Sequence, residues 1–530
     1  MKLKTFVGLC FLCVVGNLSA QRLGPQFDKI SQALFYIQNM YLDTVDMSKL
    51  TDQVLMRVVA ELDPHSSYIP VKDVEAANEP LEGNFEGIGV EFNIIMDTLV
   101  VVAPLAGGPS EAVGIQAADR IVAVNDTSIA GIGLTNEGVR SYLRGPKGTK
   151  VQLTVVRRGV REPLHFEVTR DKIPLHSIDA AYEALPDIAY VRINRFALTT
   201  MTEFIDAFEK FRRMPKGVIL DLRGNPGGYM HTALQVAEQF LEKGKMLVYT
   251  EGLNVPRQEE SASGMGFFIN TPVVVLIDEG SASSSEILAG ALQDWDRGIL
   301  IGRRSFGKGL VQHGLTLRDG SQLRLTVARY HTPTGRVIQS PYKQGDQDSY
   351  YRAMLERYMR GEQFSRDSIR LLDSLSYQTL VNNRTVYGGG GIMPDIFVPQ
   401  DTTGYTPYWA RMIRAGIVTE FMNEYIDKER ASLSAQYKQF DAFKRNYQVP
   451  DQVVDDLLAF AEQKGLPKDE EALAISLPLM RIQIKALIAR TLFDSSAYVQ
   501  LMNEWNDPTY RKALEVIQNW GRYEKEILGR

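Results

Sequence analysis

The spacing of hydrophobic and polar residues changes along this chain, and each change predicts a different kind of structure. Residues 24–80 carry apolar side chains near 3.6-residue spacing, which predicts amphipathic helices. From about residue 83 to 172, short apolar runs alternate with glycine and proline. Within them Val151, Leu153 and Val155 alternate with polar neighbours, as in a half-buried strand. This stretch predicts a small domain of about five or six strands and two helices.

The pattern becomes α/β between about residues 174 and 400. IAYVRI and GVILDLR predict apolar strands, and PVVVLID is a nearly continuous apolar run, typical of a central strand buried on both faces. A predicted helix from about Ser284 to Trp295 and a strand at GILIG follow it. This strand–helix–strand order predicts a parallel crossover. After about residue 403 the pattern predicts charged amphipathic helices to the end of the chain.

These changes predict an α/β multidomain protein, since 530 residues are too many for one core. The predicted parts are a helical N-terminal region at 24–82, an inserted β domain at 83–172, an α/β core with a mixed sheet at 173–402, and a helical C-terminal region at 403–530.

Residues 1–20 predict an export signal. Lys2 and Lys4 supply positive charge, and a short apolar segment and small residues lead to a cleavage position before Gln21. The apolar run is short for a membrane span, so we expect cleavage and an exported, periplasmic protein. The alternative is a retained segment that would associate the protein with the membrane.

Composition excludes several classes of function. Cys10 and Cys13 both lie in the signal segment, so the mature chain has no thiol for disulfides, cysteine protease chemistry or zinc binding. The net charge of −5 and the absence of a basic cluster argue against a nucleic-acid partner. The six histidines are scattered and no cofactor-binding motif is present, so we expect neither a metal nor another cofactor.

The segment DEGSASSSEILAG, residues 278–290, carries candidate chemistry. Ser283 comes directly before a predicted helix, where unpaired backbone N–H groups and the helix dipole favour negative charge. A tetrahedral oxyanion would be stabilised there, with the amide of Ser284 as one donor. The spacing Ser283-x-x-Glu286 is also that of a capping box, and this segment alone favours the cap.

The segment SFGKGLVQ, residues 305–312, changes that interpretation. Lys308 lies between two glycines, and it shares one face with Gln312 if the segment is extended. A lysine serves as the base for a serine when desolvation lowers its pKa, and Gln312 would orient the amine. Ser305-x-x-Lys308 also matches the SxxK motif of penicillin-binding proteins, but that motif needs a helix, which the glycines oppose.

A second candidate site is the peptide-binding loop Gly87-Ile88-Gly89-Val90, which precedes a predicted strand. Glycines allow backbone N–H groups to converge on a carboxylate, and the strand edge would accept an extended peptide by β-augmentation. With GIQAADRIVAVND, this stretch resembles a PDZ domain, in which Ala118 stands where the family often has glycine. A glycine-rich turn without a ligand is the alternative.

The motifs in their order resemble the carboxy-terminal processing proteases, periplasmic or plastid serine proteases with a Ser/Lys dyad. The matching motifs are LDPHSSY, the PDZ-like stretch, DLRGNPGG, GSASSSEILAGALQD, SFGKGLVQ, YHTPTGRVIQ and GGGGIMPDIFV. The resemblance implies Ser283 as nucleophile, Lys308 as base and Gln312 as the residue that holds the lysine. It places the second oxyanion donor in the NPGG turn, at the amide of Gly227 or Gly228.

The function expected from this resemblance is that of an exported serine endopeptidase. It would recognise the C-terminal regions of proteins or peptides through the PDZ-like domain and cleave them through an acyl-enzyme. The helical ends would offer surfaces for self-association or for an adaptor. Two alternatives stay open: an inactive PDZ scaffold that binds C-termini, and a Ser/His/Asp hydrolase that uses His231 or His313.

Overall fold

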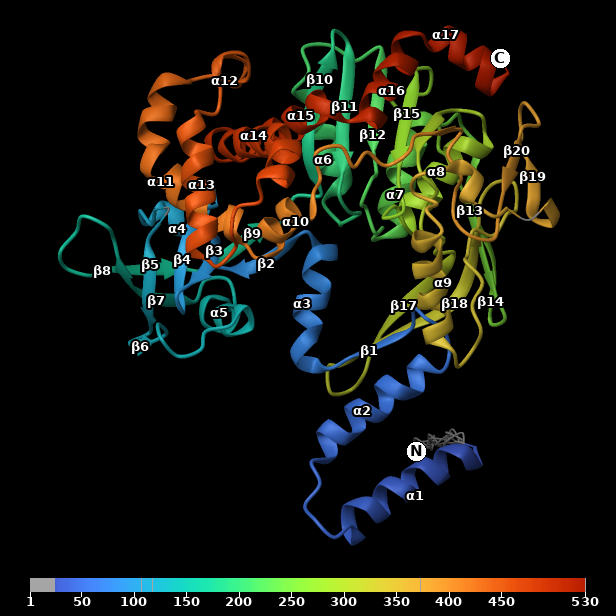
Figure 1. Cartoon of the computed structure of the whole chain (residues 1–530). Helices are drawn as coiled ribbons and strands as arrows, with labels where there is room; N and C mark the ends of the chain where they lie inside the picture. Colours follow the sequence, from blue (N-terminus) through green and yellow to red (C-terminus); the bar gives the residue numbers. More distant parts are fainter. Residues whose placement is uncertain (1–23, 106, 117, 372, 530) are drawn as a thin grey trace, which may run out of the picture. The chain divides into compact units, whose positions relative to one another are not determined.

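The computed structural model describes residues 24–105, 107–116, 118–371 and 373–529 (Figure 1). The predicted signal segment lies outside these residues. The chain forms two compact units, of which the first ends at Val59 and the second begins at Ala60. The first unit holds helix α1 (Pro25–Met40) and all but the last residue of α2 (Met47–Ala60), and α1 buries none of its side chains.

A six-stranded mixed sheet forms the centre of the second unit, in the order β10-β11-β12-β15-β16-β21. The strands are β10 (Ile178–Leu185), β11 (Ile188–Ile193), β12 (Gly217–Asp221), β15 (Val273–Ile277), β16 (Ile299–Gly302) and β21 (Ile396–Phe397). β10 and β11 pair antiparallel, and the other neighbours pair parallel. The predicted α/β core with a parallel crossover is therefore confirmed. Every residue of β12 and β15 is buried, as strands covered on both faces require.

Helices from distant parts of the chain cover the two faces of this sheet (Figure 1). One face packs against α6 (Thr200–Glu209), α7 (Met230–Ala237), η1 (Glu238–Phe240) and α8 (Ser284–Asp294). The other face is covered by α16 (Pro508–Gln518), whose Tyr510 and Ile517 share a buried cluster with Ile219 and Val274. Beside α16 lie α15 (Ser495–Asn506), α17 (Trp520–Tyr523) and the π-helix η4 (Glu524–Leu528). The C-terminal segment thus supplies one layer of the α/β core.

A second sheet brings the LDPHSSY segment next to the SFGKGLVQ segment. Its strands are β1 (Ser67–Ile69), β18 (Gln322–His331), β13 (Met246–Gly252) and β14 (Val255–Ser261), with β17 (Leu310–Thr316) paired to β18. Both β1 and β17 pair antiparallel with β18. The remaining connections contain α9 (Gln347–Met359), η2 (Arg366–Ser368), η3 (Asp373–Leu375) and the hairpin β19 (Ser376–Gln378)–β20 (Thr385–Tyr387).

The PDZ-like stretch folds around a hydrophobic core of its own. Its sheet has the order β3 (Val90–Ile95), β4 (Thr98–Pro104), β5 (Arg120–Val124), β7 (Lys150–Val156) and β8 (Leu164–Thr169), with β6 (Thr127–Ser128) beside β5. Two helices accompany it, α4 (Pro109–Ala112) and α5 (Asn136–Leu143). Helix α3 (Val71–Glu82) leads into the domain, and the pair β2 (Asn84–Gly87) and β9 (Asp171–Pro174) closes it. Ala118 has φ +64°, which explains why glycine is common at that position.

The remaining C-terminal helices enclose a separate core. They are α10 (Pro407–Arg414), α11 (Ile417–Gln436), α12 (Phe440–Asn446), α13 (Asp451–Gln463) and α14 (Glu470–Leu492). Within the part of the chain that the structure describes, α14 is the one helix long and apolar enough to cross a membrane. Its side chains at Leu473, Met480 and Ile484 are buried in this core, as in a core helix of a globular domain.

Candidate active site

Ser283 occupies a strained turn between β15 and α8. Its backbone has φ +56° and ψ −114°, a conformation that residues with a Cβ rarely adopt and that is frequent at functional sites. Its N–H donates to Oε2 of Glu286 at 2.8 Å, and the N–H of Glu286 donates back to the carbonyl oxygen of Ser283 at 2.8 Å. Glu286 therefore holds the turn, and the predicted capping relationship is part of the site geometry.

Glu286 also connects this turn to the lysine segment. Its fully buried carboxylate accepts hydrogen bonds from Ser305 Oγ at 2.5 Å, from the N–H of Gly307 at 2.7 Å and from the N–H of Lys308 at 2.9 Å. Burial raises the pKa of Glu286 to about 7, although these donors favour the carboxylate. The capping-box spacing of Ser283 and Glu286 predicts only the helix cap, because the bonds to residues 305–308 depend on the tertiary fold.

The amine of Lys308 is half-buried and oriented by an amide. Its Nζ donates to Oε1 of Gln312 at 2.9 Å, so the two residues that the extended pattern places on one face do meet. Burial, and after it the positive charge of Arg324, lowers the pKa of Lys308. The Nε2 of Gln312 donates to the main-chain carbonyl of His65, which fixes the direction of the amide.

The LDPHSSY segment contributes main-chain geometry to the site. Asp63 Oδ1 accepts the N–H groups of His65 and Ser66, both at 2.8 Å, and the hydroxyl of Thr326 at 3.1 Å. These bonds hold the turn whose carbonyl binds Gln312. The imidazole of His65 contacts Tyr350, and burial, followed by the charge of Lys308, lowers the pKa of His65 to about 4. The main-chain carbonyl of His65, and not its imidazole, therefore binds Gln312.

The NPGG turn leaves one of its two glycine amides available. The N–H of Gly227 donates to Asn225 Oδ1 at 2.8 Å, and its carbonyl accepts from Phe196. The N–H groups of Gly228 and Ser284 donate to no acceptor among the described residues, and both residues line one cleft. Of the two amides implied by the resemblance, the Gly228 amide is therefore the one free to bind a ligand oxygen.

This cleft has a volume of about 890 Å³ and contains both Ser283 and Lys308. Such a volume is ordinary for a ligand site. Apolar walls come from Ile287, Leu310, Val311 and Tyr330, and polar ones from Asn78, Asn194, Arg195 and Arg324. Arg324 is held by helix α3, since it donates to the Ala77 carbonyl at 2.9 Å and to Asn78 Oδ1 at 3.0 Å.

The hydroxyl groups of the serines next to Ser283 all form hydrogen bonds with main-chain carbonyls. The hydroxyls of Ser281, Ser284 and Ser285 donate to the carbonyl oxygens of Leu222, Gly228 and Asn225 at 2.8, 2.8 and 3.0 Å. His231 contacts Thr232, and His313 is exposed on β17. No histidine belongs to the described residues that line the cleft, and no group of three His, Cys, Asp or Glu in the described ranges could hold a metal.

The residues of the predicted peptide-binding loop lie between β2 and β3. Ile88 is buried, and its carbonyl accepts the N–H and the hydroxyl of Ser110 at 3.0 and 2.7 Å. Gly89 has φ +72°, and Gly87 and Val90 belong to the flanking strands. β3 is an edge strand, with β4 on one side, so its other edge is positioned to pair with an added strand.

Comparisons with known proteins match three parts of this chain. A model of peptidase family S41 matches residues 187–347, a PDZ domain model matches 100–157, and a family of unknown function (DUF8443) matches 408–494. The carboxy-terminal processing protease CtpA of Bacillus subtilis is 36% identical over 329 residues, which are 61% of this chain and 69% of the relative. The carboxy-terminal-processing protease of Bartonella bacilliformis is 37% identical over 324 residues, 60% of this chain and 72% of the relative.

Solved structures of similar proteins also align with this chain. The photosystem II D1 C-terminal processing protease aligns with a TM-score of 0.33 and 29% identity, covering 59% of this chain and 90% of that one. The PDZ domain of the carboxy-terminal protease from Vibrio cholerae, solved in complex with a peptide, aligns with a TM-score of 0.16 and 30% identity, covering 17% of this chain and 99% of that one.

Proposed function

This chain belongs to the carboxy-terminal processing protease family of serine peptidases, and we propose that Ser283 is its nucleophile and Lys308 its general base. The observation that carries the proposal is the half-buried amine of Lys308, which is held by Gln312 in the same cleft as Ser283. An amine with a lowered pKa is neutral in a larger fraction of molecules near pH 7, and only the neutral amine can accept a proton.

The proposed reaction begins with attack on the scissile carbonyl. The Ser283 Oγ forms a bond to the carbonyl carbon while Lys308 Nζ takes the hydroxyl proton. The carbonyl oxygen becomes an oxyanion, which accepts from the amides of Gly228 and Ser284. Collapse expels the amine of the C-terminal fragment, which receives the proton from Lys308, and leaves an ester on Ser283. Lys308 then deprotonates a water that hydrolyses this ester.

Gln312 is proposed to aim the lysine. Its Oε1 accepts one N–H of the amine, while its Nε2 is committed to the His65 carbonyl. This arrangement leaves the lone pair of a neutral Lys308 amine available for the proton of Ser283.

The PDZ domain is proposed to capture the C-terminal region of protein substrates. The loop from Gly87 to Val90 would bind the terminal carboxylate through backbone N–H groups, and the edge of β3 would pair with the peptide. The PDZ domain model that matches residues 100–157 supports a peptide-binding role for this domain.

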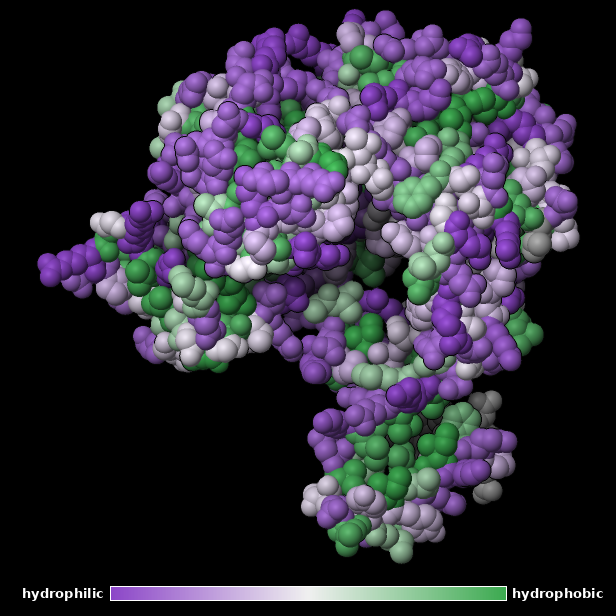
Figure 2. Space-filling model, in the orientation of Figure 1, coloured by the Kyte–Doolittle hydropathy of each residue, from purple (hydrophilic) through white to green (hydrophobic). Residues whose placement is uncertain are grey.

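Export and self-association complete the proposal. Lys2, Lys4 and the apolar segment before Gln21 support export to the periplasm. Helix α1 exposes large apolar side chains, and Figure 2 shows hydrophobic residues gathered on this unit. They are Phe27, Ile30, Phe35, Tyr36 and Met40. Several exposed apolar side chains on one helix favour contact with a second copy or an adaptor.

The two alternative functions, an inactive scaffold and a Ser/His/Asp hydrolase, do not account for the residues in the cleft. An inactive scaffold has no use for a strained serine or for a half-buried lysine amine in its cleft. A Ser/His/Asp hydrolase needs a histidine beside the serine, and neither His231 nor His313 is among the described residues that line the cleft.

Cleavage of an unfolded protein with an apolar C-terminus tests the proposal. We expect Ser283→Ala and Lys308→Ala each to lower kcat by about 10³-fold or more, with intact peptide binding. Ser495→Ala, an exposed serine at the start of α15, is the matched control. Mass spectrometry of the wild type stopped in acid should find the acyl group on Ser283. Undiminished cleavage by Ser283→Ala would refute the mechanism, and a wild type that binds peptides without cleaving them would favour the scaffold.

A further inference from the structure

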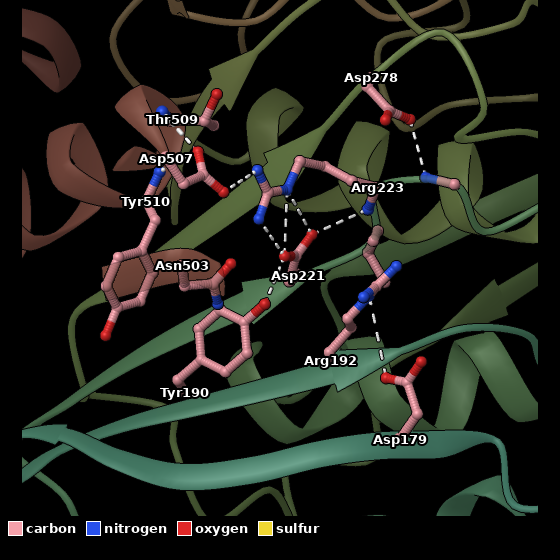
Figure 3. A network of polar contacts seen from close by, with 12 residues as sticks. Asp179, Tyr190, Arg192, Asp221, Arg223, Asp278, Asn503, Asp507, Thr509 and Tyr510 are labelled. Carbon is pink, nitrogen blue, oxygen red and sulfur yellow. Dashed lines mark hydrogen bonds and ion pairs between the residues drawn. The ribbon is translucent and has the colours of Figure 1, made fainter. Parts of the chain in front are cut away.

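One arginine connects the C-terminal helices to the loop that carries Gly228 (Figure 3). Arg223 lies two residues after Asp221, the last residue of β12, and it begins the loop of residues 223–228. Its guanidinium is shared by two carboxylates. Asp221 accepts from Nε at 2.9 Å and from Nη2 at 2.6 Å, and Asp507 accepts from Nη1 at 2.6 Å.

The first carboxylate belongs to the sheet. Asp221 is completely buried and also accepts the hydroxyl of Tyr190 at 2.5 Å and the N–H of Arg223 at 2.9 Å. Burial opposes its ionisation, but Arg223, Arg192 and the Tyr190 hydroxyl together outweigh burial, and the pKa of Asp221 lies below its ordinary value. Asp221 therefore anchors one edge of the guanidinium.

The second carboxylate belongs to the helix that covers the sheet. Oδ1 of Asp507 accepts the N–H groups of Thr509 and Tyr510 at 2.9 and 3.0 Å and so caps α16, while Oδ2 binds Arg223. The Tyr510 ring is buried under the sheet. Since α16 packs against β12 and β15, Asp507 is a rigid point from which Arg223 is held.

The loop continues from Arg223 to the free amide through a series of hydrogen bonds. Gly224 N–H donates to Asp278 Oδ1 at 2.8 Å, and Asp278 directly follows β15, the strand that leads to the Ser283 turn. The Asn225 side chain binds the Ile193 carbonyl and the Gly227 N–H, at 2.9 and 2.8 Å. Arg223, Gly224 and Asn225 thus each bind the end of a strand or the residue directly after it, and the Gly228 amide lies at the end of this loop.

We propose that Asp507 is a positioning residue for the reaction, which holds Arg223 and through it the loop that presents the Gly228 amide to the oxyanion. This inference rests on the proposed function of Ser283 and Gly228. Oxyanion donors stabilise the transition state only within a few tenths of an ångström of their place, and a displacement of about 1 Å can cost about 10²-fold in rate. The C-terminal segment is thereby a working part of the peptidase.

Asp507→Asn breaks this connection with little change in shape. Asparagine has one side-chain oxygen, so it cannot both cap α16 and accept from Arg223. If the oxygen keeps the cap, the amide N–H₂ faces the guanidinium, and two donors oppose each other. The loop then loses one of the two points that hold Arg223.

The experiment compares full-length mature enzymes by kcat and KM per active site, with sites counted by titration with a fluorophosphonate. We expect Asp507→Asn to lower kcat about tenfold with KM within about twofold of the wild type. Binding of a peptide aldehyde, whose adduct places an oxyanion on the amides, should weaken by the same factor, while binding of a product peptide stays constant. Asp507→Glu, which keeps the charge, should recover part of the rate.

Asp494→Asn is the matched control, because Asp494 caps the neighbouring α15 through the Ala497 N–H and is exposed. It should behave as the wild type.

If Asp507→Asn does not fold, Arg223→Lys takes its place, since a lysine cannot hold both carboxylates in this geometry, and the same loss is expected. Wild-type kcat per active site, or unchanged aldehyde binding with only a lower thermal midpoint, would overturn the inference. Ser283→Ala distinguishes a failure of the proposed function from a failure of this inference. If Ser283→Ala stays active, the proposed function is wrong. If Ser283→Ala is inactive while Asp507→Asn has normal activity, only the inference about Asp507 is wrong.

Discussion

Glu286 and Lys308 are joined through the main chain: Oε2 of Glu286 accepts the N–H of Lys308 at 2.9 Å. The same oxygen accepts the N–H of Ser283 at 2.8 Å. One buried carboxylate therefore sets the separation of the two segments on which the proposed dyad depends, and it does so without touching either functional group.

Replacing this carboxylate should damage both rate and stability. In Glu286→Gln an N–H₂ group must face N–H or O–H donors, because an amide has a single acceptor oxygen. We expect a loss of about 2–4 kcal/mol in the free energy of unfolding, measured in urea, and a kcat at least about 100-fold lower. Glu471→Gln, exposed on α14, is the control. Stability and activity both close to the wild type would show that Glu286 is dispensable.

Arg324 should tune the pH dependence. Burial and then the charge of Arg324 lower the pKa of Lys308, so Arg324→Gln raises that pKa. The base acts when neutral, and the acid limb of the kcat/KM profile should therefore move to higher pH. Arg324→Lys keeps the charge and should move it less. A limb that stays in place or moves to lower pH in Arg324→Gln contradicts the assignment of Lys308 as the base.

The side chain of His65 should lower the free energy of unfolding at acidic pH. Its pKa is about 4 in the folded state and about 6.5 in the unfolded chain. Between these values the unfolded chain binds a proton that the folded state does not, so stability falls as pH falls through this window. From pH 7 to pH 4 the wild type should lose about 1–2 kcal/mol more than His65→Gln, after allowance for the partial exposure of His65. His165→Gln, exposed on β8, should follow the wild type. Identical pH profiles of wild type and His65→Gln would contradict the prediction.

The NPGG turn should tolerate no side chain at its last position. A Cβ at Gly228, where φ is +141°, would lie 2.1 Å from the Phe196 carbonyl oxygen. We expect Gly228→Ala to cost about 3 kcal/mol or more and to reduce kcat at least about 100-fold. Gly224→Ala is the matched control, with φ +69° and nothing within 4 Å, and should cost about 1 kcal/mol. Equal effects of the two variants would exclude a special role for Gly228.

The local pattern of hydrophobic and polar residues was sufficient to predict the architecture of the core. The continuous apolar run of β15 and the strand–helix–strand order correctly predicted a buried parallel core, because a strand covered on both faces has no polar face to show. The order of short motifs correctly predicted the family. The roles of Ser283, Lys308 and Gln312 came from the same motifs and stay predictions.

What sequence alone determined, then, are features set by neighbours along the chain: element types, the glycine turns and the serine before a helix. The tertiary structure decided which distant groups meet. The His65 carbonyl and Gln312 are 247 residues apart, and Arg223 and Asp507 are 284 apart. The hydrophobic periodicity of the sequence cannot predict such pairs. A single hydrogen bond between distant segments depends on how sheets and helices pack, and it leaves the local pattern of either segment unchanged.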